Sequence, residues 1–113
     1  MTYNCYDVVK VPFPFTDHQT SKCRPALIIS VAEPFNNLIE HSIMAMITSA
    51  KQSAWPLDTQ ITDLKSAGLP AKSLIRLKLF TLDHRLIINS LGHLSTRDQT
   101  IFKQHFYTLI GAN

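Results

Sequence analysis

The chain has 113 residues, of which 45% are hydrophobic and 17% charged, with three glycines and six prolines. This composition is typical of a globular protein and excludes a disordered, collagen-like or coiled-coil chain. The length predicts a single domain over residues 1–113. The net charge of +3 comes from the second half, since residues 61–113 hold seven Lys or Arg against three Asp or Glu. Such a surplus fits a phosphate-bearing or acidic partner, although an ordinary protein surface can carry it as well.

The first half of the chain reads as three strands separated by polar or proline-containing segments. Pro12 and Pro14 lie at alternate positions and end the first strand, because proline cannot continue a central β-ladder. Residues 16–22 are polar and predict an exposed loop, and Asn36–Asn37 predicts a turn. The expected strands are Asp7–Val11, Arg24–Val31 and Ser42–Ile47, the last two apolar enough to be buried on both faces.

In the second half, the strand-like runs are again short. In chain order we expect a loop at Ala50–Pro56, a strand at Leu57–Ile61, a turn or one helical turn within Asp63–Leu69, and strands at Ser73–Phe80 and Leu86–Leu91, the last broken at Gly92. The run that ends at Phe80 alternates, which predicts that Arg76 and Lys78 share the face opposite its apolar residues. Two cations on one face indicate either a solvated strand or a basic stripe along a nucleic-acid backbone.

The end of the chain carries the one convincing helix signal. Ser95-Thr96-Arg97-Asp98 matches a capping box, and Gly111 is well placed to end the helix. Between them, apolar residues recur at three- and four-residue spacing: Ile101, Phe102, Phe106, Leu109 and Ile110. About six short, mostly antiparallel strands with one C-terminal helix predict a mainly β fold, a small barrel without exposed sheet edges.

Common enzyme and metal-binding motifs are absent from the sequence. The five histidines show no HxH or HxxxH spacing and no cysteine lies near them, so we expect no metal and no other cofactor. There is no P-loop, no dinucleotide-binding glycine motif and no G-x-S-x-G. Without a signal peptide or a long apolar run, we expect a cytoplasmic protein, not associated with a membrane, in which Cys5 and Cys23 stay reduced.

The candidate functional residues lie at the ends of two apolar strands. Arg24 stands between a polar loop and Pro25, which fixes the backbone after it, while Thr48 and Ser49 end the next strand. A guanidinium and two hydroxyls can hold a phosphate. A lone strand-end arginine, however, often forms a surface ion pair, and such hydroxyls often cap turns. The sole tryptophan, Trp55, lies in a predicted loop, where it is either buried or a platform for stacking nucleic-acid bases.

Several segments, in order, resemble the PemK/MazF family of toxins from bacterial toxin–antitoxin systems, and together they cover about residues 7–110. The matching segments are Asp7–Val9 with Val11–Thr16 as the opening strand and loop, Lys22–Pro25 as the K-x-R-P strand, Ile47–Ser49 as the I-T-S element, and Leu91–Ser95 as the L-G-x-L-S turn. The resemblance implies a compact SH3-like antiparallel barrel of the CcdB/PemK type with a C-terminal α-helix, usually assembled as a homodimer.

The resemblance also implies an activity and a partner. It implies a metal-independent endoribonuclease that cuts single-stranded RNA at short sequences, and a cognate antitoxin whose acidic, flexible tail covers the RNA groove. Arg24 and Thr48 fall where the family's catalytic arginine and threonine lie. Because a guanidinium stays protonated in proteins, His18 in the preceding loop is the candidate general base. We expect RNA contacts from Thr16, Lys22, Ser49, Trp55, Arg76 and Lys78.

Two residues depart from the family pattern. Tyr6 stands where the family usually has Gly before Asp7, so we expect the first turn to be built differently. Lys78 stands where some members carry an acidic residue proposed to assist catalysis. These departures keep open a catalytically silent module that binds RNA or an antitoxin. A second alternative is a toxin of the same fold, of the CcdB type, that poisons DNA gyrase by binding it. The K-x-R-P and I-T-S segments favour the nuclease over the gyrase poison.

Overall fold

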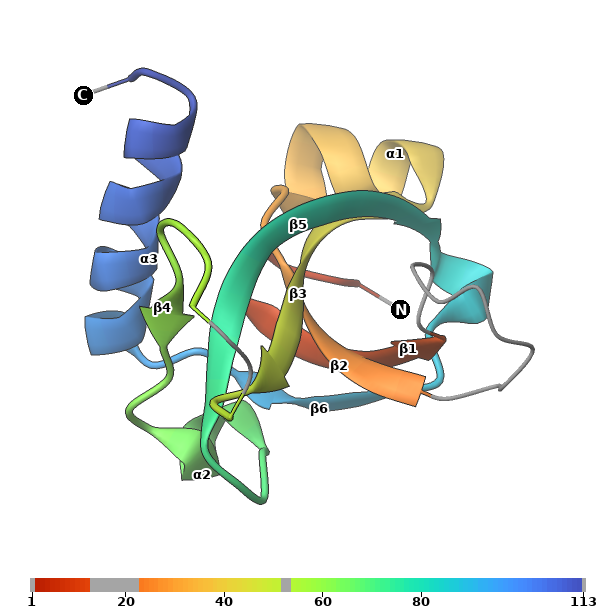
Figure 1. Ribbon diagram of the computed structural model, residues 1–113. Helices are drawn as coiled ribbons and strands as arrows, with labels where there is room; N and C mark the ends of the chain where they lie inside the picture. Colours follow the sequence, from red (N-terminus) through yellow and green to blue (C-terminus); the bar gives the residue numbers. More distant parts are fainter. Residues whose placement is uncertain (1, 13–22, 52–53, 113) are drawn as a thin grey trace.

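The computed structural model describes residues 2–12, 23–51 and 54–112, and within them six strands form one curled antiparallel sheet (Figure 1). The order across the sheet is β4-β5-β3-β2-β1-β6. The strands are β1 (Asp7–Pro12), β2 (Cys23–Ile28), β3 (His41–Ser49), β4 (Thr59–Gln60), β5 (Ser73–Asp83) and β6 (Asn89–His93). The predicted class, a mainly β half-barrel with a C-terminal helix, is confirmed.

Both faces of the sheet carry an apolar core. On one face, Leu27 and Ile75 pack with Phe102 of the C-terminal helix α3 (Thr96–Leu109). On the other face, Ala26 and Met44 pack within a second cluster that includes the N-terminal Tyr3 and Val9. Since successive strand residues point to opposite faces, the middle of β2 (26–28) and of β3 (43–47) must be apolar on both sides, which is why these sequences predicted burial on both faces.

The C-terminal helix begins as the capping box predicts. The Ser95 hydroxyl accepts a hydrogen bond from the Asp98 backbone N–H at 3.3 Å, and Gly111 follows the helix with a φ of 71°. The predicted apolar face is only partly covered, because Phe102 is buried whereas Leu109 and Ile110 are exposed. In Figure 1 this helix lies beside β4, away from β1 and β2.

Asp98 also fixes the segment before α2 (Leu64–Ala67) to the C-terminal helix. Its fully buried carboxylate accepts hydrogen bonds from the backbone N–H groups of Thr62 and Asp63, and from the Thr62 hydroxyl at 2.7 Å. Burial raises the pKa of this carboxyl, but the hydrogen bonds outweigh burial and the net pKa is lowered. The carboxylate therefore stays charged and holds the chain that leads into the 69–73 loop.

Two local expectations about turns were wrong for tertiary reasons. The turn expected at Asn36–Asn37 is part of a helical segment, η1 (Ala32–Asn36) followed by α1 (Asn37–Ile39). The side-chain amide of the buried Asn36 donates hydrogen bonds to the backbone carbonyls of Tyr3 and Ser30. Tyr3 is far away in the sequence and Ser30 lies before the helical segment, so these contacts cannot be inferred from Asn36–Asn37 alone. Gly92 lies inside β6 instead of breaking it. A Cβ at Gly92 would lie 2.3 Å from the Ser66 carbonyl oxygen, so glycine serves close packing there.

The expected strand boundaries shift in the second half of the chain. The strand expected at Leu57–Ile61 shortens to Thr59–Gln60, because Leu57 has a φ of 63° within a turn. The strand expected at Leu86–Leu91 begins only at Asn89, after a short helical turn, η2 (His84–Leu86). Such boundaries depend on pairing partners that local sequence does not reveal.

The predicted alternation along β5 is interrupted. Met46 of β3 lies opposite Arg76, but its neighbour Ala45 lies opposite Leu79, so Leu77 and Lys78 form a bulge. Arg76 is buried at 7% exposure, whereas Leu79 is 37% exposed. Of the two readings of this face, the solvated one does not hold for Arg76, because its guanidinium contacts Asp58 and the Trp55 ring.

The first turn keeps the left-handed backbone that glycine would normally supply. Tyr6 has a φ of 74°, its N–H donates to the Ile28 carbonyl at 2.7 Å, and its carbonyl accepts from Leu94 at 2.9 Å. The Tyr6 ring packs edge-on against Phe102 of α3, with centroids 6.5 Å apart. Ring packing and two hydrogen bonds thus offset the strain, and the turn itself is conventional despite Tyr6.

Candidate functional site

Arg24 and Thr48 lie where the ladder between β2 and β3 stops. The last paired residues are Ala26 and Met46, and continuing the same register by two positions would set Arg24 opposite Thr48. Pro25 lies between these positions and has no backbone N–H with which to extend the ladder. Alternation places the Arg24 and Thr48 side chains on the same face as Ala26 and Met46. The strands therefore present a guanidinium and a hydroxyl side by side.

A pocket of about 210 Å³ opens at this position, and it brings the predicted catalytic pair together. Arg24, Thr48 and Ser49 line it, with the 69–73 loop forming the opposite wall. Thr48 is buried, Arg24 and Ser49 are half-buried, and the Arg24 Nε is shielded from solvent. No Asp, Glu or His is among the described residues that line the pocket. The pocket therefore combines positive charge with hydroxyl donors, a combination suited to a phosphate.

Lys72, which sequence reasoning missed, is the second cation of the pocket wall. The Ala50 N–H donates to the Lys72 carbonyl at 3.2 Å, which ties the 69–73 loop to the end of β3. Ser49 and Ser73 are register partners in the β3–β5 ladder, so the loop emerges directly beside Thr48. Nothing near Lys72 in the sequence signals this placement, because it depends on a pairing between distant strands.

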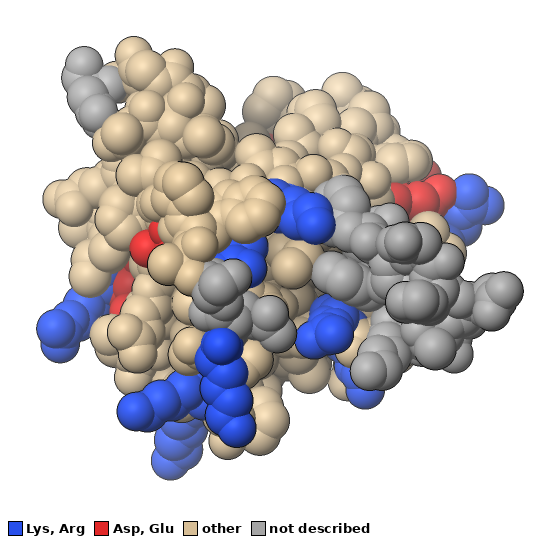
Figure 2. All heavy atoms as spheres, viewed as in Figure 1, with Lys and Arg blue, Asp and Glu red and all other residues tan. Residues whose placement is uncertain are grey.

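Positive side chains gather on the surrounding surface. In Figure 2, Lys and Arg side chains occupy the middle and lower part of the face that holds the end of β3 and the start of β5. On the same view, Asp and Glu lie toward the margins. On this face, outside the residues that are not described, Lys and Arg thus predominate over Asp and Glu.

Trp55, Asp58 and Arg76 form a separate, preorganised unit that is not part of the pocket wall. Asp58 accepts a hydrogen bond from the Trp55 backbone N–H at 3.0 Å, and it binds the Arg76 guanidinium through Nε at 3.3 Å and Nη2 at 3.0 Å. The Arg76 guanidinium carbon lies 5.2 Å from the Trp55 ring centroid, while the tryptophan is 44% exposed. Asp58 thus balances the Arg76 charge, and Arg76 supports an exposed aromatic ring.

Among the described residues, Lys78 is the remaining predicted site residue, and it lies outside the pocket wall. It is half-buried in the β5 bulge. Thr16, His18 and Lys22 lie outside the residues that the structure describes. Asp58 was also missed by sequence reasoning, although an Asp three residues after Trp55 is a recognisable turn signal.

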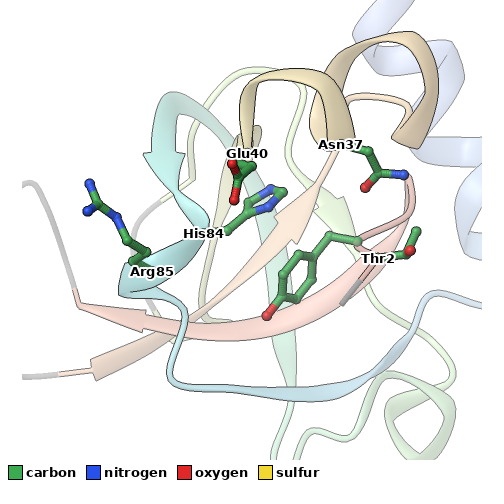
Figure 3. Close-up of a pocket in the computed structure, with 6 residues that line it drawn as sticks. Thr2, Asn37, Glu40, His84 and Arg85 are labelled. Carbon is green, nitrogen blue, oxygen red and sulfur yellow. The ribbon is translucent and has the colours of Figure 1, made fainter.

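A larger pocket, of about 530 Å³, lies at the other end of the β3–β5 pair (Figure 3). Glu40 and His84 lie close together in it, while Arg85 points away from both. The His84 ring is held by the Ser42 hydroxyl at 2.7 Å and by an edge-on contact with Tyr3 at 4.6 Å. Burial, and then the nearby His41, lower the pKa of His84. Arg85 pairs with Asp83 at 2.7 Å, so the arginine of this pocket already has a carboxylate beside it.

Two further features bear on the class of protein. Across 2–12, 23–51 and 54–112, no three His, Cys, Asp or Glu side chains are grouped so that they could hold a metal ion. In the same ranges no helix has the length and apolar character needed to cross a membrane.

Comparison with known proteins agrees with this geometry. A family model described as "PemK-like, MazF-like toxin of type II toxin-antitoxin system" matches residues 4–109. No curated protein matches the chain in sequence. Among solved structures, MazF from Deinococcus radiodurans superposes with a TM-score of 0.74 at 20% identity, covering 98% of each chain.

Two complexes are also similar. An endoribonuclease bound to its cognate antitoxin, from a mycobacterial species, gives a TM-score of 0.76 at 14% identity, covering 98% of this chain and 97% of that chain. A MazE–MazF structure from Deinococcus radiodurans gives 0.74 at 19% identity, covering 100% and 99%. These identities are low, so the structural likeness shows the fold, while the family model covers nearly the whole sequence. The chain belongs to the PemK-like, MazF-like toxins of type II toxin–antitoxin systems.

Proposed function

We propose that this chain is a cytoplasmic toxin that cuts single-stranded RNA without a metal ion, by attack of the 2′-hydroxyl on the adjacent phosphorus. The observation that carries the proposal is the pocket at the end of the β2–β3 ladder, where Arg24 and Thr48 converge with no carboxylate in the described wall. Family membership supports the same activity. A phosphate is the ligand that best fits a guanidinium, a buried hydroxyl and a positively charged rim.

In the proposed reaction, the RNA supplies its own nucleophile. The bond from O2′ to phosphorus forms and the bond from phosphorus to O5′ breaks, which leaves a 2′,3′-cyclic phosphate and a 5′-hydroxyl. Arg24 binds the non-bridging oxygens as negative charge develops on them, and Thr48 donates a hydrogen bond to one of them. Both groups are fixed on strands before substrate arrives, so little reorganisation accompanies the chemical step.

The 2′-hydroxyl must lose a proton and O5′ must gain one. Arg24 stays protonated and serves as the electrostatic clamp. No Asp, Glu or His is among the described residues of the pocket wall, so His18, which precedes Arg24 in the sequence, is proposed as the candidate base, and water is proposed to give O5′ its proton. The assignment predicts that His18→Ala removes one limb of the pH–rate profile. An unchanged profile would show that another group takes the proton.

Substrate binding is proposed to extend beyond the pocket. The exposed ring of Trp55, supported by Arg76 and Asp58, offers a surface on which an RNA base can stack. Since Asp58 already balances Arg76, we propose that Arg76 positions Trp55 instead of binding phosphate. Ser49 lies in the pocket and is proposed to bond the same phosphate as Thr48. Thr16 and Lys22 are proposed as further RNA contacts on the family resemblance, and Lys78 as a basic residue of β5.

We also propose a cognate antitoxin and a homodimer. The similar mycobacterial endoribonuclease and Deinococcus MazF were solved with antitoxin partners. An acidic antitoxin segment would compete with RNA for the basic face around the pocket. Analytical ultracentrifugation tests the dimer, and co-purification with the product of a neighbouring acidic reading frame tests the partner.

The decisive experiment incubates the purified protein with long single-stranded RNA in EDTA. We expect cleavage, 2′,3′-cyclic phosphate ends, and resistance of a substrate that carries 2′-deoxyribose at the cut site. Loss of cleavage in EDTA would contradict metal independence, and cleavage of the deoxy substrate would contradict 2′-hydroxyl attack. Growth arrest that survives Arg24→Ala, with no RNA cut, would instead favour a toxin that acts by binding, such as a gyrase poison.

A further inference from the structure

Lys72 occupies a position in the candidate pocket that the proposed reaction does not use. Lys72 forms part of the wall opposite Arg24 and Thr48, and it is exposed to solvent. Among the described residues, no carboxylate forms an ion pair with it. A charge that reaches into solvent from the rim of a phosphate-sized pocket is available to an anion bound nearby.

The backbone of Lys72 is held on both sides. Its carbonyl accepts from Ala50 at the end of β3, and the Ser73 hydroxyl closes a turn by donating to the Ala71 carbonyl at 2.9 Å. Leu69, at the start of the loop, is buried, and its N–H donates to the Leu64 carbonyl of α2 at 2.9 Å. The stem of Lys72 therefore starts from a fixed point, while its ammonium group remains able to move.

The two cations of the pocket differ in chemistry. Arg24 presents a planar fork that can bind two oxygens of one phosphate, and it is half-buried in the pocket. Lys72 is a compact, hydrated charge on a flexible stem, which suits a phosphate that moves little during the reaction and stays in contact with water. The pocket has a volume of about 210 Å³. An RNA strand that places one phosphate in the pocket must therefore carry its next phosphate across the rim of the pocket.

We infer that Lys72 forms a second phosphate subsite, which binds the backbone phosphate adjacent to the scissile one in single-stranded RNA. The inference rests on the proposed function and assigns to Lys72 a positioning role. It predicts that Lys72 contributes to substrate affinity and to its salt dependence, while the chemical step depends on Arg24 and Thr48. Each phosphate contact to a single strand contributes about 0.7 to the slope of log K against log salt.

The test measures binding separately from cleavage. A fluorescent single-stranded DNA oligonucleotide of mixed sequence, which lacks the 2′-hydroxyl and cannot be cut, is titrated with protein by anisotropy at several NaCl concentrations. The variants are Lys72→Ala, Lys72→Arg and, as a matched control, Lys103→Ala. Lys103 is an exposed lysine on α3 that lies 5.6 Å from the Tyr107 ring and is not part of the pocket wall.

We expect the Lys72→Ala slope to be shallower by about 0.7, with Lys72→Arg near the wild type and Lys103→Ala unchanged. In cleavage of single-stranded RNA, Lys72→Ala should raise KM about two- to fivefold and leave kcat nearly unchanged. If the wild-type protein cuts RNA and Lys72→Ala has the same salt slope and the same KM as the wild type, the subsite is overturned and the nuclease proposal stands. A Lys72-dependent slope in a protein that cuts no RNA would support the subsite and overturn the nuclease.

Discussion

The two ends of the β3–β5 pair carry pockets of opposite character. At one end, about 210 Å³ is lined by Arg24, Lys72 and hydroxyl groups, with no carboxylate among the described wall residues. At the other end, about 530 Å³ is lined by Glu40, His84 and Arg85, and Asp83 pairs with Arg85 beside it. The same two strands thus support a pocket whose described wall holds cations and hydroxyls, and a larger one in which carboxylates lie beside the arginine.

The contrast teaches that the kind of charged group in the wall locates the candidate chemistry better than volume does. An arginine already paired with a carboxylate gains little from an external anion, because that anion must replace a partner already in place. A pocket whose described wall offers cations and hydroxyls but no carboxylate is better suited to an anion. The smaller pocket is therefore the better site for phosphate, and substitutions at matched positions of the two ends can test this.

The largest expected effect comes from removing the arginine at each end. Arg24→Ala should lower kcat/KM for RNA cleavage about 10³-fold, because it removes the main charge facing the scissile phosphate. Arg85→Ala should change cleavage less than about twofold, since Arg85 is exposed and pairs with Asp83. Steady-state cleavage of one RNA substrate measures both. If Arg24→Ala and Arg85→Ala lower kcat/KM by similar factors, the Arg24 pocket is no better a candidate for the active site than the Arg85 pocket.

A matched pair of hydroxyls on β3 gives the next effect. Thr48→Val keeps the side-chain shape and should lower kcat about 10²-fold with little change in stability. Ser42→Ala removes the hydrogen bond to His84 and should lower the free energy of unfolding by about 1 kcal/mol, with cleavage unchanged. Activity assays and urea unfolding separate the two outcomes. An active Thr48→Val variant would contradict a catalytic hydrogen bond.

The positive pocket depends on a loop that Asp98 anchors, so Asp98 should matter to stability. Asp98→Ala leaves donors of Thr62 and Asp63 unsatisfied and should cost about 2–3 kcal/mol in urea unfolding. The lowered pKa of Asp98 adds a pH dependence. Its stabilisation is present above pH about 4 and is lost as pH falls through the lowered pKa. The Asp98→Ala variant should not show this decrease in the free energy of unfolding at acid pH. A variant as stable as the wild type would contradict the anchoring role.

The smallest expected effect is a pH dependence at the end that holds Glu40 and His84. Burial, and then the nearby His41, lower the pKa of His84, so the unfolded chain binds a proton more readily than the folded protein. Stability from this group is present above pH about 6.5 and is lost as pH falls through the lowered pKa. Subtracting the unfolding free energies of His84→Gln from the wild type at each pH should isolate this slope. A flat difference would show that His84 does not contribute.

Much of the candidate site can be predicted from the sequence. Arg24-Pro25 and Thr48-Ser49 stand out because each begins or ends an apolar run, and the family resemblance gives them roles. Their convergence in one pocket agrees with that prediction. Lys72 and Asp58 cannot be found in the same way, because one depends on the β3–β5 register and the other on a bidentate contact with Arg76.

The sequence by itself determined the strand-rich fold, the capped C-terminal helix beginning at Ser95 and the candidate pair Arg24 and Thr48, because these depend on local periodicity, capping chemistry and motif order. Only the tertiary structure decided that Arg76 is buried against Asp58, that Gly92 stays within a strand and that Lys72 lines the pocket. These three outcomes arise from strand register, a side-chain ion pair and close backbone approach, all of which are set by residues far away in the chain.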